Sequence, residues 1–339
     1  MNAPLENSNN FIRGGSTSFG TWVRLAVTGA ILAYLALKVD WAGLLGHLRN
    51  VSLPYFGLAF FVMGLPIVLT SLRWQLLLRV QEVLIPIRRA ISFDVVGLFF
   101  NAFLPGSTGG DTARVYYAIK SAPNHKTGIV VSILMDRGIG LSVLLAYGIL
   151  AFALQPELGE RSELLSTAKI LLPIALATGL SAVVIVAVYP TGKIPQFAKD
   201  WMRKLPLLRV IKNAVTSVRN HRHAPMLVLA AIGISAISYL CNFFSGFILA
   251  KALNVDSSYL QVVVILTITY TVISVPVSLS GHGVRELTLI LLFGAMGVGE
   301  TQVKELAIAY SVLLYGIQLC WSLLGGIYYI SWRPERPFR

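Results

Sequence analysis

The feature that most constrains this chain is the recurrence of long apolar runs. A helix needs about 20 mostly apolar residues to cross a hydrocarbon core of roughly 30 Å. The composition agrees with such spans, because 55% of the 339 residues are hydrophobic and only 13% are charged, unlike a water-soluble globule. We therefore expect an all-α polytopic membrane bundle. Its six full spans are predicted at residues 21–37, 55–72, 127–154, 167–189, 225–251 and 305–331.

Two further apolar stretches, at residues 91–104 and 258–298, are interrupted by glycine, proline and charged residues. Irregular backbone inside a bilayer is tolerated only where protein or a water-filled cavity satisfies its polar groups. We therefore expect two broken or re-entrant helical hairpins beside the six spans, and a polar cavity next to them.

The basic residues predict the orientation, since loops rich in Lys and Arg stay in the cytoplasm. Residues 190–224 hold Asp200 as their one acid, and this basic loop is expected to be cytoplasmic and to lie on anionic lipid headgroups. Many of the basic residues behind the net charge of +13 lie in loops between spans, so no nucleic-acid partner is expected. Both termini are predicted to be cytoplasmic, in a bacterial-type inner membrane. Basic residues on both sides of 91–111 indicate that this hairpin enters and leaves on the cytoplasmic face. The basic residues of the loop are Lys193, Lys199, Arg203, Lys204, Arg209, Lys212, Arg219 and Arg222.

The chain is expected to form one membrane domain over residues 21–331, with cytoplasmic tails at 1–20 and 332–339. Each half, 21–154 and 167–331, can be written as span, span, broken hairpin, span. An odd number of full crossings precedes the second half, so this half is predicted to be inverted relative to the first. Inverted repeats with discontinuous helices are typical of several transporter folds.

The first break, "NAFLPGSTGGDTAR" at 101–114, combines glycines with two opposite charges. Gly106, Gly109 and Gly110 permit a tight turn and the close approach of a ligand. A helix that starts near Asp111 would present amide donors and the positive end of its dipole, which suit a phosphate. The alternative is a packing turn in which Asp111 and Arg114 form an ion pair.

Two charged residues are also expected close to the middle of the bilayer. Asp136 and Arg137 lie nine and ten residues into the span at 127–154, roughly 14 Å deep at about 1.5 Å per residue. Each would cost about 2.5 to 3.5 kcal/mol there unless it is paired or hydrated. We expect both to face the interior. Arg285 and Glu286 at the second break are expected to complete the same polar path, although a purely structural ion network remains an alternative.

At these residues the chain resembles the membrane region of lysylphosphatidylglycerol synthase/flippase and its stand-alone flippase-like relatives. The resemblance rests on "SLRW" at 71–74, "NAFLPGSTGGDTAR" at 101–114, "DRGIG" at 136–140 and "PVSLSGHGVRE" at 276–286. It implies that Arg73, Asp111, Arg114, Asp136, Arg137, Arg285 and Glu286 line a lipid-headgroup path. The chain ends eight residues after Ser331, so no soluble aminoacyl-transfer domain is expected.

These features together predict a lipid translocator for a phospholipid or a related phosphate-bearing lipid. The full candidate substrate-binding set is Arg73, Asn101, Gly106, Gly109, Gly110, Asp111, Arg114, Asp136, Arg137, Ser278, Gly281, Gly283, Arg285 and Glu286. The alternatives are a membrane enzyme that acts on a lipid phosphate, with Asp111, Asp136 or His282 as acid or base, and a membrane scaffold.

Neither a cofactor nor an enzymatic activity is expected. The sequence lacks the G-x-x-x-x-G-K-[ST] motif of an ATPase. It also shows no metal-ligand cluster, because His221 and His223 are two residues apart and point in different directions on a helix. Cys241 and Cys320 lie inside apolar spans, which argues against a disulfide framework. A separate lipid-modifying enzyme and a second copy of the chain are left open as partners.

Overall fold

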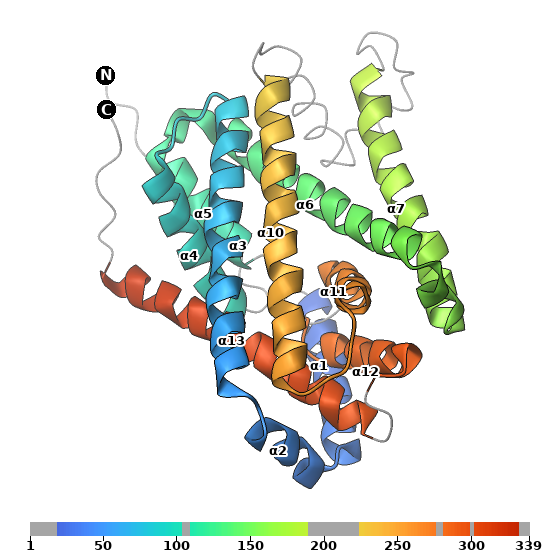
Figure 1. Ribbon diagram of the computed structural model, residues 1–339. Coiled ribbons are helices and arrows are strands. Elements are labelled where there is room, and N and C mark those ends of the chain that lie inside the picture. Colours follow the sequence, from blue (N-terminus) through green and yellow to red (C-terminus); the bar gives the residue numbers. More distant parts are fainter. Residues whose placement is uncertain (1–18, 104–108, 189–223, 276–280, 299–301, 332–339) are drawn as a thin grey trace, which may run out of the picture.

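The structure is a computed structural model that describes residues 19–103, 109–188, 224–275, 281–298 and 302–331. Within these ranges every regular element is helical (Figure 1), which confirms the predicted all-α class. The longer helices are α1 Phe19–Lys38, α2 Trp41–Arg49, α3 Leu53–Val80, α4 Ile87–Phe103, α5 Gly109–Ser121, α6 Lys126–Leu154, α7 Glu163–Val188, α10 Ala224–Ala252, α11 Tyr259–Ser274, α12 Val284–Met296 and α13 Val303–Ser331. Two short 3-10 helices, η2 Pro123–His125 and η3 Pro156–Glu160, flank α6.

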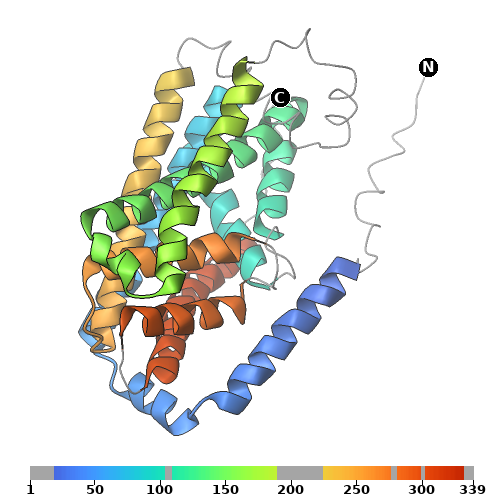
Figure 2. The ribbon, with the colours of Figure 1, turned by 90° about the vertical axis from the view of Figure 1, so that its right-hand side faces the viewer.

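In the part of the chain that the structure describes, five helices are long and apolar enough to cross a membrane: α3, α6, α7, α10 and α13. They cover five of the six predicted spans. The sixth, expected at 21–37, falls on α1, which bends by 88° into α2 and qualifies as a span only if the two count together. Asp40 lies at the bend and caps the start of α2, since its side chain accepts from the Ala42 amide at 3.0 Å. Figure 2 shows α1 running along one side of the molecule.

Helix α3 is longer than the apolar run that predicted it. The predicted span ends at residue 72, whereas α3 continues to Val80 and therefore contains Arg73 and Arg79. The extension is stabilised by tertiary contacts, since Trp74 and Gln75 are buried and Gln75 donates to the Ile85 carbonyl at 3.1 Å. Arg73 is therefore a buried side chain of α3.

Both interrupted stretches form two short helices each. Helices α4 and α5 pack against one another, as do α11 and α12, and each of the four is shorter than the about 20 residues that a span needs. The breaks at 104–108 and 276–280 lie outside the described residues. The first hairpin is longer than the predicted 91–111, running from Ile87 to Ser121. Arg114, one of the basic residues that follow 91–111, lies inside α5.

The packing of the two halves follows one scheme (Figure 1). Helices α3 and α10 lie side by side and make the most extensive contact in the bundle. If α3, α4, α5 and α6 are exchanged with α10, α11, α12 and α13, the packed pairs map onto packed pairs. For example, the contact of α4 with α13 corresponds to the contact of α11 with α6. In the same way, the contact of α2 with α13 corresponds to the contact of α7 with α6. The observed contacts are those that a two-fold repeat would make.

Apolar side chains from both halves form the main core. Its fully buried members include Leu144, Phe243, Leu266, Leu289 and Tyr310, from α6, α10, α11, α12 and α13. A second, smaller cluster joins the end of α3 to α4, α5 and the start of α6 around Trp74 and Phe93. The polar site described next lies beside this second cluster, because Trp74 contacts it directly.

Candidate functional site

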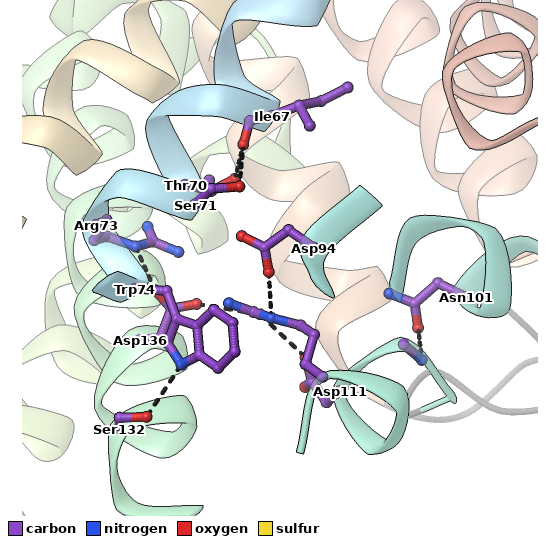
Figure 3. A network of polar contacts seen from close by, with 12 residues as sticks. Ile67, Thr70, Ser71, Arg73, Trp74, Asp94, Asn101, Asp111, Ser132 and Asp136 are labelled. Carbon is purple, nitrogen blue, oxygen red and sulfur yellow. Dashed lines mark hydrogen bonds and ion pairs between the residues drawn. The ribbon is translucent and has the colours of Figure 1, made fainter. Parts of the chain in front are cut away.

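A polar cavity of about 390 Å³ lies among α3, α4, α5 and α6, with one residue each from α10 and α11 at its wall. Its charged lining consists of three arginines and three aspartates. Figure 3 shows Arg73, Asp94, Asp111 and Asp136 pointing towards one another from four helices. The lining residues are Thr70, Arg73, Asp94, Gly97, Leu98, Asn101, Asp111, Arg114, Asp136, Arg137, Gly140, Leu141, Leu144, Tyr239 and Ser274.

The deepest pair joins α3 to α6. Arg73 Nε lies 2.6 Å from Asp136 Oδ1, and Arg73 Nη1 donates to Ser235 Oγ on α10 at 3.0 Å. The two side chains are 9% and 4% exposed. Gly140 admits the guanidinium, because a Cβ there would lie 3.3 Å from Arg73 Nη1. Asp136 therefore faces the interior, as its depth in the span predicts, whereas the side chain of Arg137, for which the same was expected, is 54% exposed.

Arg114 lies at the centre of the cluster and contacts three carboxylates. Its Nε is 2.5 Å from Asp94 Oδ1, and its Nη1 is 3.4 Å from Asp111 Oδ1 and 3.6 Å from Asp136 Oδ2. The guanidinium also stacks over Trp74 at 4.3 Å, a cation–π contact that strengthens when both groups are desolvated. The predicted pair of Asp111 and Arg114 is thus present, as part of a larger network.

The outermost pair joins α5 to α6. Asp111 Oδ2 lies 2.7 Å from Arg137 Nη2 and accepts from Arg137 Nε at 2.9 Å. The Asp111 side chain is 18% exposed and that of Arg137 is 54% exposed. The network therefore runs from a buried pair at Arg73 and Asp136 to a solvent-accessible pair at the edge of the cavity.

Asp94 is the charged lining residue that sequence reasoning missed. It lies on α4, is buried, and pairs with Arg114. A signal for it existed, because an acid in the otherwise apolar run "ISFDVVGLFF" at 91–100 carries the same insertion cost that singled out Asp136.

The glycines of the first break serve the packing of α4 on α5. A Cβ on Gly110 would collide with the Gly97 carbonyl and with Asn101. Asn101 lines the cavity and accepts the Gly110 N–H at 2.8 Å. One of the backbone N–H groups that were predicted to bind a phosphate at the start of α5 is therefore already bonded to Asn101. Gly109 begins the helix, whereas Gly106 lies outside the described residues.

The second break forms a separate cluster. Arg285 Nη2 lies 2.7 Å from Glu286 Oε1, and this oxygen also accepts from Ser311 Oγ at 2.8 Å. The other carboxylate oxygen accepts the Gly283 N–H at 2.6 Å and caps α12. Neither charged residue lines this cavity, so the expectation that Arg285 and Glu286 complete the same path stays a prediction. Their charges are used in holding α12 to α13.

Gly281 and Gly283 have φ angles of +80° and +81°, which side chains other than glycine rarely adopt. A Cβ on Gly283 would also lie 2.9 Å from Ile31 of α1. These two glycines therefore shape the turn into α12. They do not line the cavity. Ser278 lies outside the described residues, and so does the basic loop expected to bind anionic lipids.

A spacing shared by the two breaks was also missed. Both contain the pattern P-x-S-x-x-G-x-x-x-R, which starts at Pro105 in one half and at Pro276 in the other. Each pattern ends in an arginine that stacks on an aromatic ring, Arg114 over Trp74 at 4.3 Å and Arg285 over Tyr315 at 4.7 Å. This spacing is a stronger sign of an internal repeat than glycine and proline content alone.

The chemistry that the cavity can perform is recognition of charge. Guanidinium groups bind phosphate oxygens through paired hydrogen bonds, and carboxylates attract ammonium groups. Among the residues that the structure describes, no group of three or more His, Cys, Asp or Glu side chains has the arrangement of a metal site.

Comparison with known proteins gives a consistent family. Residues 21–322 match the family described as the lysylphosphatidylglycerol synthase TM region. A UPF0104 membrane protein of Pyrococcus horikoshii is 22% identical over 325 residues, which cover 89% of this chain and 95% of the relative. A second UPF0104 membrane protein, of Methanocaldococcus jannaschii, is 23% identical over 285 residues, covering 79% and 82%.

Proposed function

The chain belongs to the family of the lysylphosphatidylglycerol synthase TM region, and from this premise we propose that it moves a phosphate-bearing lipid between the two leaflets of a membrane. The lipid class is a phospholipid or a related lipid phosphate. The observation that carries the proposal is the cavity with three arginines and three aspartates, enclosed by helices of a membrane bundle. The lipid crosses chemically unchanged in this account.

The location of the charges supports transport. Charged side chains in a membrane are costly and are kept where they pair or line a hydrated path. Here they pair, yet they also surround about 390 Å³ of space, whereas a purely structural network needs no cavity. Exposure of Arg137 at the edge of the cavity gives a headgroup a point of entry.

The kind of charge supports a phosphate as the recognised group. Arg114 and Arg137 lie on neighbouring helices and both reach Asp111, so they converge on one small anion. Planar guanidinium groups are well suited to phosphate oxygens. Asp94 and Asp136 lie deeper, where they hold the arginines in position and give a cationic part of a headgroup an acidic surface.

Reconstitution tests the proposal. The purified protein is placed in liposomes that contain a trace of phospholipid with a fluorescent headgroup, and a membrane-impermeant reductant is added outside. Translocation brings inner-leaflet label to the outside, so fluorescence falls further than in protein-free liposomes. Quenching limited to the outer leaflet in both preparations, with the protein shown to be inserted, rejects the proposed function.

A further inference from the structure

We propose that the carboxylate of Asp111 occupies the position of the lipid phosphate when the cavity is empty, and that headgroup binding displaces it from Arg137 and Arg114. This inference rests on the proposed function for the identity of the ligand. It assigns Asp111 the role of an internal competitor, whereas sequence reasoning placed this residue among the groups that bind the substrate.

The contacts of Asp111 are those of a bound anion. One oxygen receives two nitrogens of the same guanidinium, Arg137 Nη2 at 2.7 Å and Nε at 2.9 Å. The other oxygen lies 3.4 Å from Nη1 of Arg114. A phosphate between two arginines forms the same set of charge-assisted hydrogen bonds. A phosphate and the Asp111 carboxylate therefore compete for the same donors.

The three acids of the cavity differ in how readily they can leave. Side chains of Asp94 and Asp136 are 7% and 4% exposed, and removing their arginine would strand a buried charge. Asp111 is 18% exposed and its partner Arg137 is 54% exposed, so displacing this carboxylate disturbs the least buried ion pair of the cavity. Ion pairs at such accessible positions are weak and exchange easily. Asp111 is thus the acid that an incoming phosphate displaces.

Competition by the Asp111 carboxylate weakens the binding of a headgroup and speeds its release. An empty cavity keeps its arginines neutralised, and a loaded cavity has a carboxylate ready to take the place of the departing phosphate. Loss of the Asp111 charge is expected to tighten headgroup binding and to slow release. The maximal translocation rate then falls while the half-saturating lipid concentration also falls.

Equilibrium binding tests the exchange directly. The probe is dihexanoyl phosphatidylglycerol, titrated by calorimetry into the full-length protein in detergent, with dihexanoylglycerol as the phosphate-free probe. Asp111→Asn is expected to lower the Kd for the phosphate probe by up to about fivefold, as for loss of one accessible ion pair. The matched control is Asp256→Asn, which removes the same charge from an exposed pair with Lys251 at 3.8 Å and should leave the Kd unchanged.

A second background separates competition from general electrostatics. If Asp111 competes for Arg137, the gain from Asp111→Asn is largely lost in Arg137→Gln protein, because the contested donor is absent. An unchanged Kd in Asp111→Asn protein, or a gain of equal size in both backgrounds, overturns the inference. Translocation is measured on the same preparations. Tighter binding without any translocation by the unmodified protein would reject the proposed function and leave the anion exchange at Asp111 standing.

Discussion

At the scale of single residues, Asp136 carries the strongest functional expectation. Its carboxylate contacts Arg73 at 2.6 Å and Arg114 at 3.6 Å, and its side chain is 4% exposed. Asp136→Asn keeps the shape of the side chain and removes the charge that balances two arginines. We expect the initial rate of lipid translocation to fall at least about tenfold, which corresponds to roughly 1.4 kcal/mol. The rate is measured in liposomes that contain equal amounts of inserted protein.

Removing one partner of a buried pair also destabilises a protein, by about 3 to 5 kcal/mol, so a second variant is needed. Arg73→Gln combined with Asp136→Asn removes both charges and should recover much of the lost thermal stability. Translocation by this double variant should stay low. Translocation at the normal rate would mean that this pair serves only to hold the helices together.

Asp94 shows what residue-level reasoning can and cannot find. The insertion cost that selected Asp136 applies equally to an acid within the apolar run at 91–100, so Asp94 was predictable. Its partner was not, because the contact between Asp94 and Arg114 depends on how α4 and α5 pack. The pairing of Glu286 with Ser311, 25 residues later in the chain, could not be predicted for the same reason.

At the scale of helices, the close approach of α4 and α5 depends on Gly97 and Gly110. A Cβ on Gly110 would meet the Gly97 carbonyl and Asn101, and overpacking of this kind costs about 1 to 3 kcal/mol. Gly110→Ala is expected to lower the apparent melting temperature in detergent by several degrees. Gly316→Ala on α13 is the control, because a Cβ there has no neighbour within 4 Å. A melting temperature that rises for both variants would show that α4 and α5 do not need the glycine contact.

The first hairpin also makes a topological prediction. Arg89 near the start of α4 and Lys120 near the end of α5 should face the cytoplasm together, because the hairpin is expected to enter and leave on one face. Single cysteines at these positions, in protein that lacks Cys241 and Cys320, should both react with an impermeant maleimide only from the cytoplasmic side. Reaction from opposite sides would replace the re-entrant hairpin with a full crossing.

Helix positions were predicted well where length and apolar content decide them, as for α6, α7, α10 and α13. The predicted helix bounds were wrong where tertiary contacts determine where a helix ends. Helix α3 continues past its apolar run because Trp74 bonds to Ser132 at 3.0 Å and Gln75 to the Ile85 carbonyl. Asp40 caps the start of α2 at the bend from α1, and apolar content carries no information about a cap.

At the scale of the whole molecule, the two halves make corresponding contacts but hold their charges differently. Arg114 in the first half faces a cavity with three carboxylates, whereas Arg285 in the second is paired with the adjacent Glu286 and with Ser311. A transporter built from an inverted repeat can alternate access by exchanging the conformations of its halves.

Competition for translocation by lipids with and without a phosphate distinguishes recognition of the headgroup from recognition of the acyl chains. Liposomes with the unmodified protein and a headgroup-labelled phospholipid receive an excess of unlabelled phosphatidylglycerol or of diacylglycerol with the same acyl chains. Because Arg114 and Arg137 converge on one anion, phosphatidylglycerol should slow transport of the labelled lipid and diacylglycerol should not. Equal slowing by both lipids would show that the path recognises acyl chains alone and would contradict the phosphate-binding role of the cavity.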